Sequence, residues 1–141
     1  ALAAAMGRAM LAEGADLLDV GGESTRPGAR EVPEAEELSR ILPVIRALAG
    51  EALLSVDTRK APVAEAALRA GAKIVNDVSG LRFDPALAHA ARDADALVLT
   101  HSVGTPETMQ DDPRYDDVLL DVYDALEAAL ASAGAAGVRR E

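Results

Sequence analysis

Short apolar runs alternate with longer segments of helical periodicity along the whole chain, and this alternation restricts the fold more than any other feature. Four runs have the length of a strand, and each is followed by polar or turn residues and then by a helical pattern: 16–20, 52–56, 73–75 and 96–100. This order is typical of βα units, whose strands pair in parallel. The sequence therefore predicts an α/β fold with parallel strands and about four βα units.

A helix is predicted before the first strand and after each of the four strands along the sequence. Their apolar residues recur at spacings of three and four, and glycine or proline residues mark their ends. The predicted helices span residues 1–13, 34–48, 60–70, 84–92 and 118–134. The last helix is expected to bury a face made of Val118, Leu119, Val122, Leu126, Ala129 and Leu130. Asp111-Asp112-Pro113, just before it, predicts a turn.

The length of the chain limits how much of a barrel it can form. A complete (β/α)8 barrel, or TIM barrel, needs about 250 residues, whereas this chain has 141. We therefore expect a partial TIM barrel, with an open α/β sheet of four strands as the alternative. No linker or low-complexity tract divides the sequence, so residues 1–141 are expected to form a single domain.

Composition narrows the classes of partner. The net charge of −10 and the lack of a basic cluster interleaved with aromatic residues argue against nucleic acid. The chain has no cysteine, which excludes disulfides, thiolate metal sites and a cysteine nucleophile. No apolar segment reaches the roughly 20 residues that span a bilayer. We expect a cytoplasmic protein that acts on small molecules, without a membrane partner.

Polar residues lie at the carboxyl ends of all four predicted strands: Asp19, Asp57, Asn76 and His101. In parallel α/β folds this end of the sheet carries the working residues. A carboxylate at Asp57 suits a heterocycle with N–H donors, and the Asn76 amide can both donate to and accept from the adjacent edge. The alternatives are a helix cap at Asp57, an Asx turn at Asn76-Asp77 and a purely structural hydrogen bond at His101.

The segment from Asp19 to Gly28, Asp-Val-Gly-Gly-Glu-Ser-Thr-Arg-Pro-Gly, has more functional groups than a connector needs. Its backbone N–H groups, the hydroxyls of Ser24 and Thr25, and the Arg26 guanidinium could engage a phosphate-bearing substrate. It lacks the spacing of a P-loop or of a dinucleotide fingerprint, and an ordinary surface loop is the alternative. No spacing of His, Asp or Glu marks a metal site.

Four motifs together closely resemble the dihydropteroate synthases, the folate-pathway family that joins a dihydropterin diphosphate to 4-aminobenzoate. The motifs are Asp19 to Gly28, Ser55 to Thr58, Asn76 to Gly80 and Gly104 to Gln110. The resemblance covers essentially the whole chain. It implies a pterin-binding TIM barrel of which these residues form about strands two to five, so the pterin-binding domain at 1–141 is expected to be incomplete at both ends relative to the family.

The resemblance also implies roles for particular residues. The pterin-binding set would be Asp57 and Asn76, which hydrogen-bond the ring, together with Val78, an apolar contact, and Asp19. The mobile loop that closes near the diphosphate and helps to bind 4-aminobenzoate and sulfonamides would be Ser24, Thr25, Arg26 and Pro27. Within that loop, Thr25 and Arg26 are the expected catalytic residues.

The implied reaction is a transferase step of folate biosynthesis. It condenses 6-hydroxymethyl-7,8-dihydropterin diphosphate with 4-aminobenzoate to give 7,8-dihydropteroate and diphosphate. Magnesium assists departure of the diphosphate, but the family's metal-binding Asn lies outside this span, so no metal ligand is expected within it. The complete protein is expected to be a homodimer.

One departure from the family pattern keeps other hypotheses open. After the fourth strand the family usually has Met-His-Met, whereas this chain has Thr100-His101-Ser102, which would weaken an apolar wall of the pterin pocket. This change keeps open the alternative of a non-catalytic pterin-binding paralogue. A pterin-binding domain of a methyltetrahydrofolate methyltransferase is the other alternative, and the Ser-Thr-Arg-Pro-Gly loop argues against it.

Overall fold

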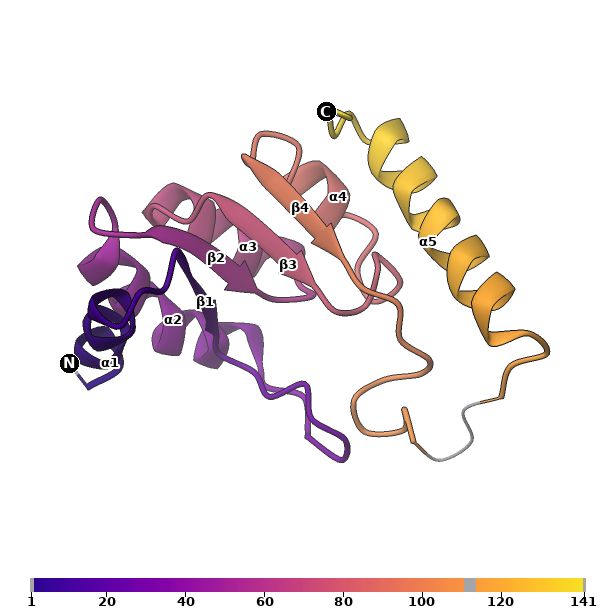
Figure 1. Cartoon of the computed structure of the whole chain (residues 1–141), viewed down its shortest axis with the longest axis horizontal. Helices are drawn as coiled ribbons and strands as arrows, with labels where there is room; N and C mark the ends of the chain where they lie inside the picture. Colours follow the sequence, from indigo (N-terminus) through magenta and orange to yellow (C-terminus); the bar gives the residue numbers. More distant parts are fainter. Residues whose placement is uncertain (1, 111–113, 141) are drawn as a thin grey trace.

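In the residues that the computed structural model describes, 2–110 and 114–140, four parallel strands form one sheet in the order β1-β2-β3-β4 (Figure 1). The elements in chain order are α1 (Leu2–Ala12), β1 (Leu17–Gly21), α2 (Glu34–Leu48), β2 (Leu53–Asp57), α3 (Ala61–Ala70), β3 (Ile74–Asp77), α4 (Leu87–Ala90), β4 (Ala96–Leu99) and α5 (Val118–Ala135). The predicted parallel α/β architecture is confirmed. The turn predicted at Asp111-Asp112-Pro113 lies outside the described residues.

The sheet has one face covered by helices and one open face. Successive strand residues point to opposite faces. Leu54, Val56 and Val75 are fully buried on the covered face, beneath α2 and α3. On the other face Leu53 and Val98 remain 42% and 46% exposed. The core therefore lies between the sheet and its helices.

Helix α2 anchors this core through one stripe of its surface. Ile41, Ile45 and Leu48 recur at helical spacing and are at most 1% exposed. The helix continues through Pro43 to Leu48. Glu37 lies four residues before Ile41 on the same stripe and is also buried, at 1% exposure. A carboxylate in that position needs partners of opposite charge, and these lie at the candidate site.

The helix predicted over 84–92 is much shorter in the structure, where α4 covers only Leu87–Ala90. The Asp84 carboxylate accepts hydrogen bonds from the backbone N–H of Ala61 at 2.8 Å and of Ala86 at 3.1 Å. These bonds hold residues 84–86 in a turn against the start of α3. Asp84 thus links two segments instead of opening a longer helix.

The prediction of a buried face on α5 is wrong for most of its residues. Ala129 is buried, but Val118 and Leu119 are 61% and 76% exposed. The reason is the position of α5 along the β4 edge of the sheet, where its main contacts are with β4 and α4 (Figure 1).

Across the described segments, none of the helices combines the length and the apolar character that a membrane crossing requires.

Candidate functional site

The carboxyl ends of the strands bring three of the predicted site residues onto the open face of the sheet. Gly21, Asp57, Asn76 and Val98 stand in register across the four strands. Asp19 is not at the end of its strand, because β1 continues to Gly21, and it pairs instead with Ser55 one layer deeper. The expected strand-end position of Asp19 is therefore wrong, although it faces the same side of the sheet.

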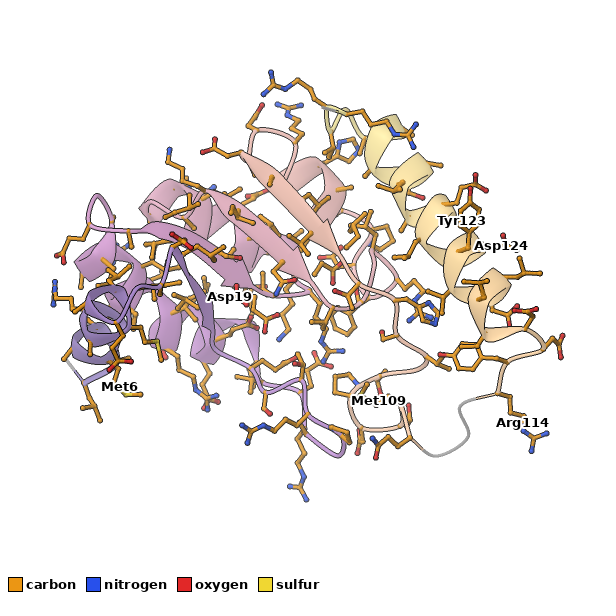
Figure 2. The ribbon with its side chains drawn as sticks, in the orientation of Figure 1. Met6, Asp19, Met109, Arg114, Tyr123 and Asp124 are labelled. Carbon is orange, nitrogen blue, oxygen red and sulfur yellow. The ribbon has the colours of Figure 1, made fainter. Side chains whose placement is uncertain are left out.

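Asp19 and Asn76 are joined directly, although they come from strands that are not neighbours. The Asn76 side-chain amide donates to Asp19 Oδ2 at 3.1 Å. The bond passes across β2, where the residue in register with Asp19 is the small Ser55. Figure 2 shows Asp19 on β1 beside the neighbouring strands. We call Asp19, Asp57 and Asn76 the sheet-end cluster.

Asp57 is the residue of this cluster with unused hydrogen-bonding capacity. Among the described residues, its buried Oδ1 atom has no hydrogen-bond partner. Burial, followed by the negative charges of Asp19 and Glu37, raises the pKa of Asp57 from 3.8 to about 6. The carboxylate is mostly ionised at pH 7. It is thus a charged acceptor that the protein itself leaves unsatisfied.

Gly21 keeps space beside this carboxylate. It stands next to Asp57 in the sheet, and a Cβ atom at Gly21 would lie 3.4 Å from Asp57 Oδ2. A larger side chain would extend over the carboxylate and restrict access to it. Gly21, the first glycine of the Gly-Gly pair, therefore belongs to the site, although the Gly-Gly sequence alone indicated only a turn.

Neighbouring residues, and not Asp57 or Asn76, have the structural roles that were the alternatives for this pair. The N-cap of α3 is Lys60, without a capping side chain, so Asp57 does not cap that helix. The Asx-type turn after β3 is made by Asp77, whose carboxylate accepts from the N–H groups of Ser79 and Leu81 at 2.8 and 2.6 Å. Asp57 and Asn76 remain available to a ligand.

A cavity of about 440 Å³ adjoins the ends of β3 and β4. Thr25 and Val78 line it, together with the apolar side chains of Phe83 and Met109. Figure 2 shows Met109 on the long loop that follows β4. Asp57 and Asn76 are not part of its lining and face the open side of the sheet instead. The candidate site thus has two adjoining parts, the sheet-end cluster and this cavity.

The loop between β1 and α2, residues 22–33, supplies Thr25 to the cavity. Thr25 is half-buried, whereas Ser24, Arg26 and Pro27 are exposed at the tip of the loop. The Gly28 N–H donates to the Pro106 carbonyl at 2.8 Å, which connects this loop to the one after β4. The structure therefore brings Thr25 to the cavity wall and leaves its three neighbours facing solvent.

A buried group of charges lies at the base of loop 22–33, and sequence reasoning missed it. Glu23 accepts from Arg59 Nε at 2.8 Å and from Lys60 Nζ at 2.7 Å. Lys60 also donates to Glu37 Oε2 at 2.7 Å. Two signals could have revealed the group: Glu37 shares the apolar stripe of its helix with Ile41, and the Arg59-Lys60 pair directly follows a buried strand.

Arg59 joins this group of charges to the cavity. Its guanidinium carbon lies 3.9 Å from the centroid of the Phe83 ring, a cation–π contact. Both residues line the cavity. Gly22 allows the loop to start so close to α2, because a Cβ atom there would lie 2.9 Å from Glu37 Cγ and from Ile41 Cγ2. The loop base and the cavity wall are therefore one continuous structure.

The segment Thr100-His101-Ser102 is polar in structure as well as in sequence. His101 Nε2 lies 3.1 Å from the Tyr115 hydroxyl, while its buried Nδ1 atom has no hydrogen-bond partner among the described residues. Ser102 Oγ accepts from Arg82 Nη2 at 3.0 Å. The departure from Met-His-Met therefore adds a polar connection between the loops that follow β3 and β4.

No group of three His, Cys, Asp or Glu side chains suited to a metal ion occurs within residues 2–110 and 114–140. The donors in this part of the chain do not by themselves make a complete cation site.

Comparison with known proteins places the fold and the motifs in a family. A dihydropteroate synthase of Mycobacterium leprae is 50% identical over 135 residues, which cover 94% of this chain and 48% of that protein. The solved structure of Yersinia pestis dihydropteroate synthase with a sulfonamide drug has a TM-score of 0.87 at 42% identity, covering 94% of this chain and 49% of that one. That of Burkholderia cenocepacia dihydropteroate synthase complexed with 7,8-dihydropteroate has a TM-score of 0.85 at 48% identity, covering 94% and 48%.

These likenesses confirm the predicted partial TIM barrel and the resemblance to dihydropteroate synthases. The chain spans about half or less of the length of the curated relatives that it matches. The family described as pterin binding enzyme matches residues 1–141. Given that match and the four motifs at or beyond the carboxyl ends of one parallel sheet, the chain belongs to the family of pterin binding enzymes.

Proposed function

We propose that this chain functions as part of a dihydropteroate synthase. In the reaction, the bond between the pterin methylene carbon and the diphosphate oxygen breaks, and its electron pair leaves with diphosphate. The nitrogen of 4-aminobenzoate donates its lone pair to that carbon and then loses a proton. The products are 7,8-dihydropteroate and diphosphate. Relatives of the same name at 43–50% identity support this assignment.

The observation that carries the proposal is the unsatisfied acceptor at Asp57 beside the amide of Asn76. A pterin ring presents adjacent N–H donors and a carbonyl on one edge. An ionised carboxylate accepts hydrogen bonds from two such donors. The neighbouring Asn76 amide, which can both donate and accept, matches the donor and carbonyl groups next to them on the ring edge. Asp19 holds the Asn76 amide at 3.1 Å and so fixes which way it points. Val78, on the cavity wall, would contact the ring as an apolar surface.

Loop 22–33 would provide the residues near the reacting groups. Thr25 lies at the cavity wall, and we expect the exposed Ser24, Arg26 and Pro27 to close over bound substrates. A guanidinium suits both the departing diphosphate and the carboxylate of 4-aminobenzoate. The residues in this span would position the reactants and stabilise the changing charge, and none of them acts as a nucleophile.

The remaining parts of the proposal rest on the family resemblance. Mg2+ would be the cofactor, with its protein ligand outside these residues. The partners would be the two small-molecule substrates and a second copy of the complete protein, in the cytoplasm. The neighbouring structures solved with 7,8-dihydropteroate and with a sulfonamide drug support the choice of substrates.

The test is to incubate the full-length protein with dihydropterin diphosphate, 4-aminobenzoate and Mg2+ and to follow diphosphate release. We expect release that depends on 4-aminobenzoate. Arg26→Ala should lower kcat/KM about tenfold while the affinity for the dihydropterin without its diphosphate stays unchanged, because the loop arginine acts on the diphosphate and the second substrate. A wild-type protein that binds the pterin without releasing diphosphate would contradict the proposed synthase.

A further inference from the structure

A single lysine connects both ends of loop 22–33. Lys60 Nζ donates to the Val32 carbonyl, to Glu23 Oε2 and to Glu37 Oε2, each at 2.7 Å. All three of its N–H groups are therefore used. Glu23 lies where the loop begins, Val32 where it ends, and Glu37 on α2. The ammonium group thus ties the two ends of the loop to each other and to the helix that follows.

Glu23 closes the same ring of contacts from the loop side. Its Oε2 atom also accepts from the Val32 backbone N–H at 2.7 Å, while Oε1 accepts from Arg59 Nε at 2.8 Å. Both backbone polar groups of Val32 are therefore bound by side chains of this group. We call Glu23, Glu37, Arg59 and Lys60 the loop-base network.

The loop-base network is buried and balanced in charge, and its Lys60 ammonium uses all three of its N–H donors. Its side chains are between 1% and 10% exposed, and two carboxylates face two cations. Burial alone would raise the pKa of Glu23, but hydrogen bonds from Lys60, Val32 and Arg59 outweigh it and lower that pKa. Burial would lower the pKa of Lys60, and its bonds to Glu23 and Glu37 raise it instead.

A buried, charge-balanced network of this kind fixes one geometry, because any displacement leaves a charge without its partner. Thr25 is only two residues from Glu23 and lines the cavity together with Arg59. The position of the cavity wall is therefore set at the loop base. Residues 24–31 can move only as a segment whose two ends stay fixed.

We propose that Lys60 is a positioning residue, which fixes both ends of loop 22–33 so that Thr25 and Arg26 meet the second substrate. This role rests on the proposed synthase function as far as turnover is concerned. In this role Lys60 contacts neither the pterin ring nor Asp57. Loss of the Lys60 ammonium should therefore release the loop without disturbing pterin binding.

The test compares Lys60→Met with wild type in the full-length protein. Steady-state kinetics should give a kcat about 10- to 100-fold lower and a raised KM for 4-aminobenzoate, because misplaced positioning groups cost turnover. The affinity for 6-hydroxymethyl-7,8-dihydropterin, which lacks the diphosphate, should stay within about twofold of wild type, since the loop groups differ from the ring-binding groups. Arg8→Met is the matched control, because it removes the exposed Arg8–Glu51 ion pair far from the loop.

A second readout does not depend on catalysis. Trypsin can cut after Arg30, inside the loop, and this cut should become at least tenfold faster in Lys60→Met but not in Arg8→Met. Hydrogen exchange at the Val32 amide, which Glu23 binds, should accelerate in parallel. These two measurements test the anchoring of the loop even if the protein proves not to be a synthase.

If Lys60→Met does not fold, Glu23→Gln is the second variant, because it keeps the side-chain volume and removes one charge of the network. It should release the same cut site and the same amide. A folded Lys60→Met protein with wild-type cleavage after Arg30 and wild-type KM for 4-aminobenzoate would overturn the proposal. So would a loss of pterin affinity equal to the loss of turnover.

Discussion

Two carboxylates near the same end of the sheet, Asp57 and Glu23, have opposite environments. Asp57 has a buried oxygen without a partner among the described residues, and burial raises its pKa to about 6. Glu23 is bound by Arg59, Lys60 and the Val32 N–H, and these bonds lower its pKa. The difference teaches that hydrogen-bond saturation distinguishes the acid that is available to a ligand from the acid that holds a loop.

The largest expected effect is on stability, at Glu23. Glu23→Gln keeps one acceptor oxygen but leaves the charges of Arg59 and Lys60 unbalanced in a buried setting. We expect the free energy of unfolding to fall by about 3 kcal/mol, as is typical when one partner of a buried ion pair is removed. Urea denaturation of the full-length protein measures it. A loss below about 1 kcal/mol would mean that the loop-base network contributes little.

The next effect is on pterin binding, at Asp57. Asp57→Ala removes the acceptor for the ring's N–H donors, and two charge-assisted hydrogen bonds are worth about 3 kcal/mol or more together. Affinity for dihydropterin diphosphate should therefore fall at least about 100-fold in titration calorimetry. Equal affinity in the variant would refute the role given to Asp57.

The third effect is smaller and opposite in sign to the first. Because the folded protein raises the pKa of Asp57 above its ordinary 3.8, the folded state binds more protons than the unfolded state between about pH 4 and 6. The cost of keeping Asp57 ionised thus grows as the pH rises through this range and is complete above it.

Asp57→Asn should therefore stabilise the fold by about 1–2 kcal/mol at pH 7, after allowance for solvent screening. The gain should disappear near pH 4. Urea denaturation at pH 4 and pH 7 measures both values. If Asp57→Asn were destabilising at pH 7, Asp57 would resemble Glu23, and the contrast between the two acids would fail.

The parallel sheet and the neighbouring strand-end positions of Asp57 and Asn76 could be predicted because their signals are local. Each strand is one apolar run, and Asp57 and Asn76 directly follow or end such runs. Asp19 was expected at the end of its strand, but strand register depends on pairing between segments, and β1 continues to Gly21, the first of two glycines that indicate a turn. The short α4 likewise depends on a tertiary bond, from Ala61 N–H to Asp84.

The loop-base network shows why the rest of the site was out of reach. Its members lie up to 37 residues apart in the chain. In sequence, Glu37 looks like an acid in the first turn of a helix and Lys60 like an ordinary helix start. Only their convergence on Glu23 gives them a common role. A charged residue on an apolar stripe, as at Glu37, is the signal to look for in similar chains.

The measurement that tests the central claim most directly is the pH dependence of dihydropterin diphosphate binding to the full-length protein, in wild type and in Asp57→Asn. If the Asp57 carboxylate reads the ring, wild-type affinity should hold from pH 8 to about 6 and then fall about tenfold per pH unit. The Asn variant should bind weakly at every pH. A wild-type affinity that stays constant down to pH 5, or an Asn variant that binds as tightly as wild type at pH 8, would contradict the account.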